Sequence, residues 1–180
     1  MKIINGNLDG VLLIQPAVFE DQRGFFYECF RQDKLAEAGV DHQFVQDNLS
    51  KSTKGTIRGL HFQAPPFAQG KLCQVISGAV LDVVVDIRKG SPTYGQHFST
   101  VLSDENHHLL WIPPGFAHGF SVLSEIAIFH YKCTGVYNKQ SERTLLYNDP
   151  ALGIDWKTEI PVVSEKDAQG VPLSLLDNPF

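Results

Sequence analysis

Three residues suited to binding an anion and moving a proton lie close together in this chain. Arg58, His61 and Lys71 fall within fourteen residues, on a β-rich segment that also contains Gly59 and Gly70. A guanidinium is a permanent cation, an imidazole exchanges a proton near neutral pH, and an ammonium stabilises developing negative charge. The set suits an enzyme that holds an anionic substrate and deprotonates it. A packed strand histidine beside two solvated cations is the ordinary alternative, and these residues alone leave it open.

Length, charge and cysteine content narrow the class of protein. The chain has 180 residues, and we expect residues 1–180 to form a single domain. The net charge of −5, without a basic block, argues against a nucleic-acid partner. The three cysteines include no CxxC pair, which predicts a reducing, cytoplasmic location. No run approaches the roughly eighteen apolar residues of a membrane span, so we expect no membrane partner.

Short strands separated by Gly and Pro turns dominate the pattern and predict an all-β sandwich or barrel. A helix is expected only at 32–38, with a capped helical turn at 164–167. The predicted strands are 11–14, 25–28, 44–50, 72–77, 80–87, 98–102, 109–112, 117–123 and 126–133. In the strand 80–87, alternation puts Asp82 and Asp86 on one face with two valines. That face suits either solvent or a barrel interior with a polar site.

The histidines of such a barrel invite comparison with metal-binding cupins. Those proteins use an HxH pair with a downstream Glu, and a PxGxxHxxxN element. Here the segment 113–118 keeps the turn and its histidine, but Val122 replaces the Asn and Gln63 replaces the second histidine of the HxH pair. His107-His108 supplies no substitute, since adjacent strand residues face opposite ways. The ligand set is incomplete, so we expect no metal and no cofactor.

Acid–base chemistry needs a base, an acid and a group that stabilises charge. His61 can act as the base, the Tyr131 hydroxyl as a proton donor, and Lys71 can stabilise an enolate oxygen. Together they could remove a proton from carbon beside a ketone and return one to the opposite face. Taken alone, Tyr131 fits a packed aromatic residue equally well.

A series of motifs runs along the chain in fixed order. They are DxRGFFxE from Asp21, QDNxS from Gln46, RGLHFQ from Arg58, GKL from Gly70, DVxVDIR from Asp82, PGFAHGF from Pro114, YKxT from Tyr131, Tyr137 itself and SxKD from Ser164. From about residue 8 to about residue 170, the chain resembles the dTDP-4-dehydrorhamnose 3,5-epimerase family in the order and spacing of these motifs.

The resemblance implies a fold, an assembly and a reaction. The fold would be a cupin-type jelly-roll barrel with short peripheral helices, paired as a homodimer. The enzyme would be an isomerase that converts dTDP-4-dehydro-6-deoxy-D-glucose to dTDP-4-dehydro-L-rhamnose in dTDP-L-rhamnose biosynthesis. The C4 ketone of this substrate acidifies the protons on C3 and C5, so no metal is required.

The family's catalytic roles transfer to this chain motif by motif. The resemblance implies His61 as the base, with Asp167 holding its ring as a carboxylate partner does. It implies Tyr131 as the acid on the opposite face, and it places Lys71 beside the C4 oxygen.

The same resemblance implies a set of substrate contacts. Arg23 and Arg58 would bind the diphosphate, while Phe26 and Tyr137 would stack on the thymine. The other contacts to sugar, base and phosphate would come from Glu28, Gln46, Asp47, Asn48, His118, Glu142 and Lys166. The N-terminal strands would cross to the partner, so Arg23, Phe26 and Glu28 would serve the neighbouring site.

Three alternatives and one geometric question stay open. A single-site epimerase of a related dTDP-4-keto-6-deoxyhexose would keep the same base and acid. A non-catalytic cupin that binds a nucleotide sugar or serves as a dimerisation module, and a metal-dependent oxygenase or isomerase, are readings from other classes. By strict alternation Arg58 and His61 face opposite sides. Either Gly59 permits an irregularity in the strand, or the diphosphate lies over the barrel's rim.

Overall fold

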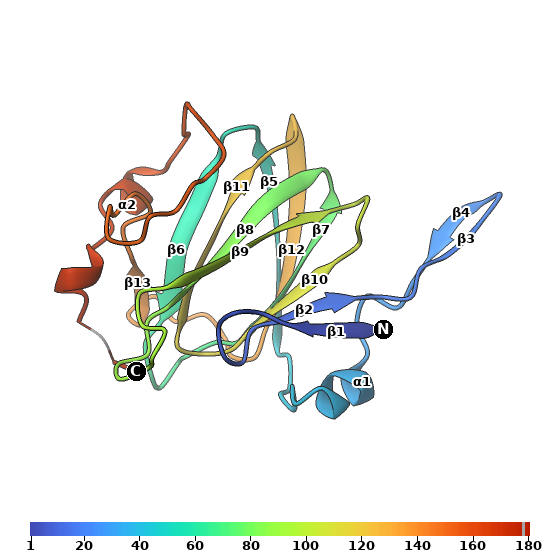
Figure 1. The fold of residues 1–180 in the computed structure, drawn as a ribbon, viewed down its shortest axis with the longest axis horizontal. Coiled ribbons are helices and arrows are strands. Elements are labelled where there is room, and N and C mark those ends of the chain that lie inside the picture. The colour runs from blue at the N-terminus through green and yellow to red at the C-terminus, as the bar shows by residue number, and fades with distance from the viewer. Residues whose placement is uncertain (178) are drawn as a thin grey trace.

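The structure is a computed structural model of the chain, and it describes residues 1–177 and 179–180. In this part of the chain there are thirteen strands, two short α-helices and one 3-10 helix (Figure 1). The strands are β1 (Lys2–Asn5), β2 (Leu12–Gln15), β3 (Phe19–Asp21), β4 (Gly24–Phe26), β5 (Gln46–Thr53), β6 (Ile57–Gln63), β7 (Lys71–Ser77), β8 (Ala79–Asp86), β9 (His97–Ser103), β10 (Leu109–Ile112), β11 (Phe116–Val122), β12 (Ile126–Cys133) and β13 (Glu142–Thr144). The helices are α1 (Gln32–Glu37), α2 (Glu165–Ala168) and η1 (Leu173–Leu175).

Two antiparallel sheets face each other and form the barrel. The six-stranded sheet has the order β1-β2-β10-β7-β12-β5, and the five-stranded sheet has the order β13-β6-β11-β8-β9. Neighbouring strands are mostly far apart in sequence, as expected of a jelly roll. The fold is therefore the predicted all-β, cupin-type jelly roll with short peripheral helices.

The predicted strands 72–77 and 80–87 are both present, but they belong to different sheets. β7 pairs with β10 and β12, whereas β8 pairs with β9 and β11. The chain crosses between the sheets at Gly78, which has a φ of 83°. A side chain there would collide with the carbonyl oxygen of Ile126, so the crossing requires glycine.

The barrel interior holds the main core, and strand alternation decides which side chains enter it. Val80 and Val84 of β8 pack inside with Phe120 and Phe129, so Asp82, on the same face, points into the barrel. The open choice between solvent and a polar interior is thus resolved in favour of the interior. The outer face of the five-stranded sheet is covered by C-terminal residues such as Trp156.

Gly59 resolves the question of strand parity around Arg58 and His61. The pairing of β6 with β11 shifts register between His118 and Phe120, opposite Gly59. Gly59 has a φ of 130°, and a Cβ there would lie 2.5 Å from the Cα of Gly119. Because of this bulge, Arg58 and His61 line the same hollows, as the predicted irregularity requires.

Near the N-terminus, strands β3 and β4 form a two-stranded arm that projects from the barrel (Figure 1). Its rings Phe19, Phe25 and Phe26 are 66%, 58% and 68% exposed. At the base of the arm, Phe25 and Tyr27 pack against His107, with ring centroids 4.5 Å and 4.9 Å apart. The arm therefore presents a large apolar surface that the barrel leaves uncovered.

The helices follow the predicted positions, while three short strands, β1, β3 and β13, were missed. α1 buries Leu35 against the outer face of the six-stranded sheet, and Ser164 caps α2 by accepting a hydrogen bond from the Asp167 amide. β1 and β13 carry weak alternation, and pairing with β2 and β6 stabilises them. Within the described residues, no helix has the length and apolar character needed to cross a bilayer.

Candidate active site

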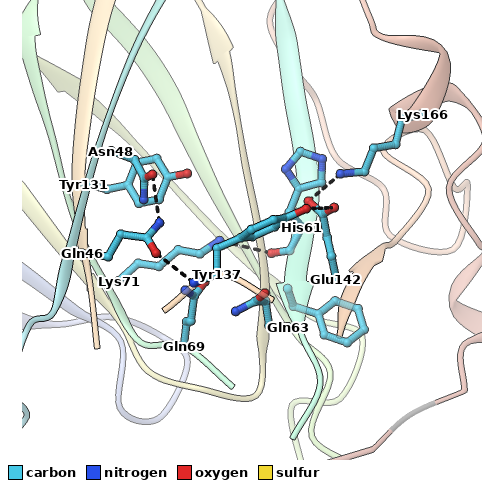
Figure 2. Close-up of a pocket in the computed structure, with 11 residues that line it drawn as sticks. Gln46, Asn48, His61, Gln63, Gln69, Lys71, Tyr131, Tyr137, Glu142 and Lys166 are labelled. Carbon is cyan, nitrogen blue, oxygen red and sulfur yellow. Dashed lines mark hydrogen bonds and ion pairs between the residues drawn. The ribbon is translucent and has the colours of Figure 1, made fainter. Parts of the chain in front are cut away.

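A cavity of about 380 Å³ opens into the barrel between the two sheets (Figure 2). Its walls combine five strands with helix α2, so residues that are distant in sequence converge here. The lining residues are Gln46, Asn48, His61, Phe62, Gln63, Gln69, Lys71, Tyr131, Tyr137, Glu142 and Lys166. Of the fifteen predicted site residues, eight line this cavity directly.

His61 extends into the cavity from β6 and is held from behind by Asp167. Its Nε2 lies 2.6 Å from Oδ1 of Asp167, whose Oδ2 accepts a hydrogen bond of 3.2 Å from the Gly59 amide. Burial alone would raise the pKa of Asp167, but the hydrogen bonds from His61 and Gly59 lower it below its usual value. The carboxylate is therefore ionised. It fixes one ring nitrogen of His61 as the donor and leaves a lone pair on the other.

Tyr131 enters the same cavity from the opposite sheet. It lies on β12, and its face is shared with the core residue Phe129. Burial raises the pKa of Tyr131 well above its usual range. The phenol consequently keeps its proton at neutral pH, as an acid on the wall facing His61 must.

Lys71 lies at the start of β7, between these two groups (Figure 2). Its Nζ donates a 3.3 Å hydrogen bond to the carbonyl oxygen of His61 and lies 5.9 Å from the centre of the Tyr131 ring. Burial lowers the pKa of Lys71, while nearby Cys73, Cys133, Asp82 and Glu142 oppose the shift. Lys71 thus lies between His61 and Tyr131 in the cavity.

Three predicted contacts form a network at the cavity mouth. Glu142 Oε2 accepts a 3.0 Å hydrogen bond from the Tyr137 hydroxyl, and its Oε1 lies 2.5 Å from Nζ of Lys166. Burial would raise the pKa of Glu142, but these two partners lower it. The carboxylate therefore fixes an aromatic ring and a cation at the entrance.

The β5 residues divide by strand parity. Gln46 and Asn48 face the cavity and bond to each other at 3.1 Å, and Gln46 also accepts a 2.8 Å hydrogen bond from the Tyr137 amide. Asp47 points to the outer face, where it lies 2.9 Å from Nζ of Lys132. The structure therefore does not bring the Asp47 side chain to the cavity.

Arg58 lies beside the cavity in an adjoining hollow of about 710 Å³. Its Nε donates a 2.9 Å hydrogen bond to Ser52, and Lys51 and Lys166 line the same hollow. Three cations around one open hollow suit an anionic group.

His118 lies deeper than predicted for a residue that only contacts substrate. It is 5% exposed, and its Nε2 lies 2.9 Å and 3.1 Å from the two carboxylate oxygens of Asp82. It nevertheless lines a third hollow together with His61, Lys71 and Tyr131. Among the described residues, Cys73, Asp82 and His118 form the one group of three possible metal ligands within 4.8 Å of each other.

Three predicted residues lie far from this chain's own cavity. Arg23 is ion-paired with Asp21 at 2.5 Å, Phe26 is exposed, and Glu28 pairs with Arg31 at 3.4 Å. Arg23 and Phe26 belong to the projecting arm, with Glu28 just beyond it. Within a single chain, these three residues therefore do not reach the cavity.

Sequence reasoning assigned no role to three residues that shape the cavity. Gln63 binds the loop around Tyr137. Its side chain accepts a 2.7 Å hydrogen bond from the Asn138 amide and donates a 3.3 Å hydrogen bond to the Val136 carbonyl. Gln69 donates a 2.6 Å hydrogen bond to the Gly135 carbonyl. The carboxylate of Asp82 accepts a hydrogen bond from His118. Gln63 and Asp82 carried a signal in the sequence, since they belong to the RGLHFQ and DVxVDIR motifs, whereas Gln69 belongs to none of the motifs.

Comparison with known proteins agrees with this geometry. A profile of the family described as dTDP-4-dehydrorhamnose 3,5-epimerase matches residues 5–174. The chain belongs to this family. The dTDP-4-dehydrorhamnose 3,5-epimerase of Shigella flexneri is 51% identical over 171 residues, which cover 94% of each protein. The family and its fold were thus correctly predicted from the motifs.

Solved structures of similar chains include epimerases of two kinds. The 3,5-epimerase of Legionella pneumophila in complex with dTDP-4-keto-L-rhamnose has a TM-score of 0.95 and 50% identity, over 98% of this chain and 94% of that one. ChmJ, a 3'-monoepimerase from Streptomyces bikiniensis in complex with dTDP-quinovose, has a TM-score of 0.88 and 32% identity. The match covers 93% of this chain and 86% of ChmJ. The dTDP-4-dehydrorhamnose 3,5-epimerase family fold therefore also accommodates a single-site enzyme.

Proposed function

We propose that this chain is a dTDP-4-dehydrorhamnose 3,5-epimerase. Its substrate would be dTDP-4-dehydro-6-deoxy-D-glucose, inverted at C3 and C5 to give dTDP-4-dehydro-L-rhamnose. One observation carries the proposal: a histidine–carboxylate pair and a protonated phenol face one cavity from opposite sheets, with an ammonium between them. This arrangement suits inversion, because the proton can leave one face of the carbon and return to the other.

The chemistry proceeds through an enolate. The free ring nitrogen of His61 takes the proton from C3 or C5, the C–H electron pair moves into the ring, and negative charge collects on the C4 oxygen. Lys71 stabilises this oxygen, and Asp167 stabilises the imidazolium. Tyr131 then protonates the same carbon from the opposite face, and exchange with solvent returns a proton to Tyr131 and removes the one held by His61.

The nucleotide end of the substrate has matching groups outside the barrel. Arg58 and Lys166 border the adjoining hollow and suit the diphosphate, while the exposed Tyr137 offers a face for the thymine. The Legionella pneumophila relative binds dTDP-4-keto-L-rhamnose, which supports a dTDP-linked substrate. Gln46, Asn48, Glu142 and His118 would complete the sugar and base contacts.

We also propose that the protein is a homodimer of single-domain chains. A two-stranded ribbon with three exposed phenylalanines is marginal by itself in water, and a second copy would cover it. Arg23, Phe26 and Glu28 would then reach the partner's nucleotide site. The side chain of Asp47 would not contact substrate directly.

A cytoplasmic location belongs to the same proposal. Cys29, Cys73 and Cys133 are all unpaired thiols, and a reducing compartment keeps them so. The nucleotide-linked substrate is made and used where nucleotides are, which agrees with this location.

The second candidate is a single-site epimerase, favoured by the similarity to the monoepimerase ChmJ. NMR of the sugar in heavy water separates the two functions. A double epimerase takes up solvent deuterium at both C3 and C5, whereas a single-site enzyme takes it up at one carbon. The His61→Ala variant should show no exchange. Exchange that persists in this variant would refute the assignment of His61 as the base. Binding of the substrate with no exchange in the natural protein would indicate a non-catalytic role.

A further inference from the structure

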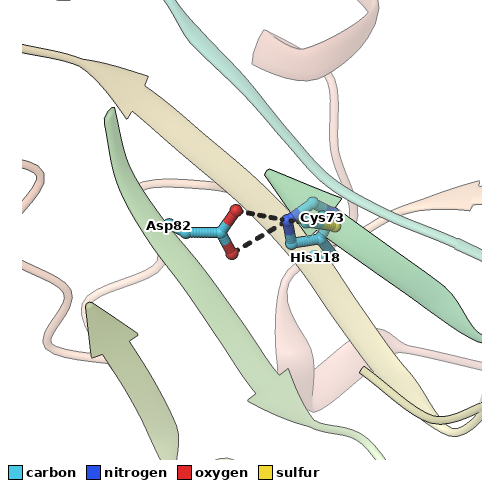
Figure 3. Close-up of side chains that lie close together, drawn as sticks. All are labelled: Cys73, Asp82 and His118. Atoms are coloured by element: carbon cyan, nitrogen blue, oxygen red, sulfur yellow. Dashed lines mark hydrogen bonds and ion pairs between the residues drawn. The ribbon is translucent and has the colours of Figure 1, made fainter. Parts of the chain in front are cut away.

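A second histidine–carboxylate pair lies beside the first. His118 on β11 is the cross-strand partner of His61 on β6, and both residues line a hollow of about 310 Å³ that also contains Lys71 and Tyr131. Asp82, on the next strand, is fully buried and turns both oxygens toward Nε2 of His118 (Figure 3). The reaction described above uses no group of this second pair as a base or an acid.

The state of the pair follows from its contacts. A carboxylate oxygen only accepts hydrogen bonds, so Nε2 of His118 carries the proton. Burial lowers the pKa of His118, Asp82 opposes this, and the nearby Lys71 lowers it further. The ring is therefore neutral at pH 7, with one fixed tautomer.

The nearby thiol does not turn the pair into a metal centre. Cys73 Sγ lies 4.0 Å from the same Nε2, but a metal would need the lone pair that this nitrogen gives up to its proton. Burial raises the pKa of Cys73 well above its usual value, which keeps the thiol protonated. The ammonium of Lys71 also repels a cation. The chemistry of the three groups favours hydrogen bonding over coordination.

We propose that Asp82 is a positioning residue for the epimerisation: its two carboxylate oxygens hold the ring of His118 in one orientation at the wall of the hollow that His118 shares with His61, Lys71 and Tyr131. The inference rests on the proposed function. Asp82 lies one layer behind the cavity and acts through His118.

The test compares Asp82→Asn with the natural protein in the dTDP-sugar exchange assay. We expect kcat to fall about 10- to 100-fold with a smaller change in KM, as for other residues behind a catalytic group. Asp82→Glu keeps a carboxylate for Nε2 of His118 and should retain more of the rate than Asp82→Asn. His118→Gln should lose rate to a similar extent as Asp82→Asn, because Asp82 acts through this ring.

The control is Asp86→Asn, which removes an equally buried carboxylate from the same strand. Asp86 binds Arg88, Ser91 and Thr93 outside the cavity, so this variant should lose stability while kcat keeps its natural value. A folded Asp82→Asn protein with the natural kcat would overturn the inference. If Asp82→Asn does not fold, the natural kcat in His118→Gln would overturn it. Absence of exchange in the natural protein would instead reject the proposed function.

Discussion

His61 and Tyr131 reach one cavity from opposite sheets of the barrel. His61 lies on β6 of the five-stranded sheet, whereas Tyr131 lies on β12 of the six-stranded sheet. A flat sugar ring between the two sheets would therefore expose one face to the imidazole and the other to the phenol. This relationship allows proton removal and proton return to be tested separately.

Tyr131→Phe should uncouple exchange from inversion. The ring still packs on Phe129, and His61 can remove a proton and return it to the same face, so deuterium uptake should continue. Formation of the inverted sugar should fall by about 100-fold or more, the usual effect of losing a general acid. NMR in heavy water measures both quantities in one sample. Tyr94→Phe, on a loop outside the cavity, is the matched control, and natural inversion by Tyr131→Phe would contradict the assignment.

Asp167→Asn should reduce kcat by about 10- to 100-fold with little change in KM. The amide still accepts a hydrogen bond from Gly59, but it no longer stabilises the imidazolium of His61. Steady-state kinetics give both constants. Glu165→Gln removes the neighbouring exposed carboxylate and should leave both constants unchanged. Equal losses of kcat in Asp167→Asn and Glu165→Gln would mean that Asp167 does not assist His61 as the base.

Arg23→Ala and His61→Ala chains should complement each other when coexpressed. If the arm serves the partner's site, each mixed dimer contains one site with an intact barrel and an intact arm. Random pairing then restores roughly a quarter of the natural activity, since half of the dimers are mixed and each has one working site. His61→Ala mixed with Asp167→Asn should restore none. Failure of the first mixture, with dimers confirmed by mass, would rule out the crossed arm.

The ionised side chain of Asp86 should stabilise the folded protein, and this stabilisation should be lost at acid pH. Burial opposes ionisation, but hydrogen bonds from Arg88, Thr93 and Ser91 lower the pKa of Asp86 from 3.8 to about 2. A lowered folded-state pKa gives stability that is present above 3.8 and lost as the pH falls toward 2.

The difference in Tm between the natural protein and Asp86→Asn should therefore shrink across that range. Thermal unfolding followed at several pH values measures it. Asp155→Asn removes an exposed partner of Lys157 and should change Tm little at any pH. A gap for Asp86→Asn that stays constant down to pH 2 would show that the carboxylate acts through packing alone.

Local signals in the sequence predicted much of the fold. The strands 109–112 and 126–133 coincide with β10 and β12, and the helix at 32–38 differs from α1 by one residue. Ser164 caps α2 as its position before Glu165 indicated. β1, β3 and β13 escaped prediction because they have only three or four residues each and depend on pairing with β2, β4 and β6.

The sequence by itself determined the residue types, the family and the faces that strand residues share, because alternation along one strand is a local property. It thereby put Tyr131 with the core residues of β12. Only the tertiary structure decided that β7 and β8 enter different sheets, and that Asp167 lies against His61 across 106 residues. It also decided that Asp82 faces the barrel interior. These relationships depend on which faces pack together when the barrel closes, and no local pattern encodes that choice.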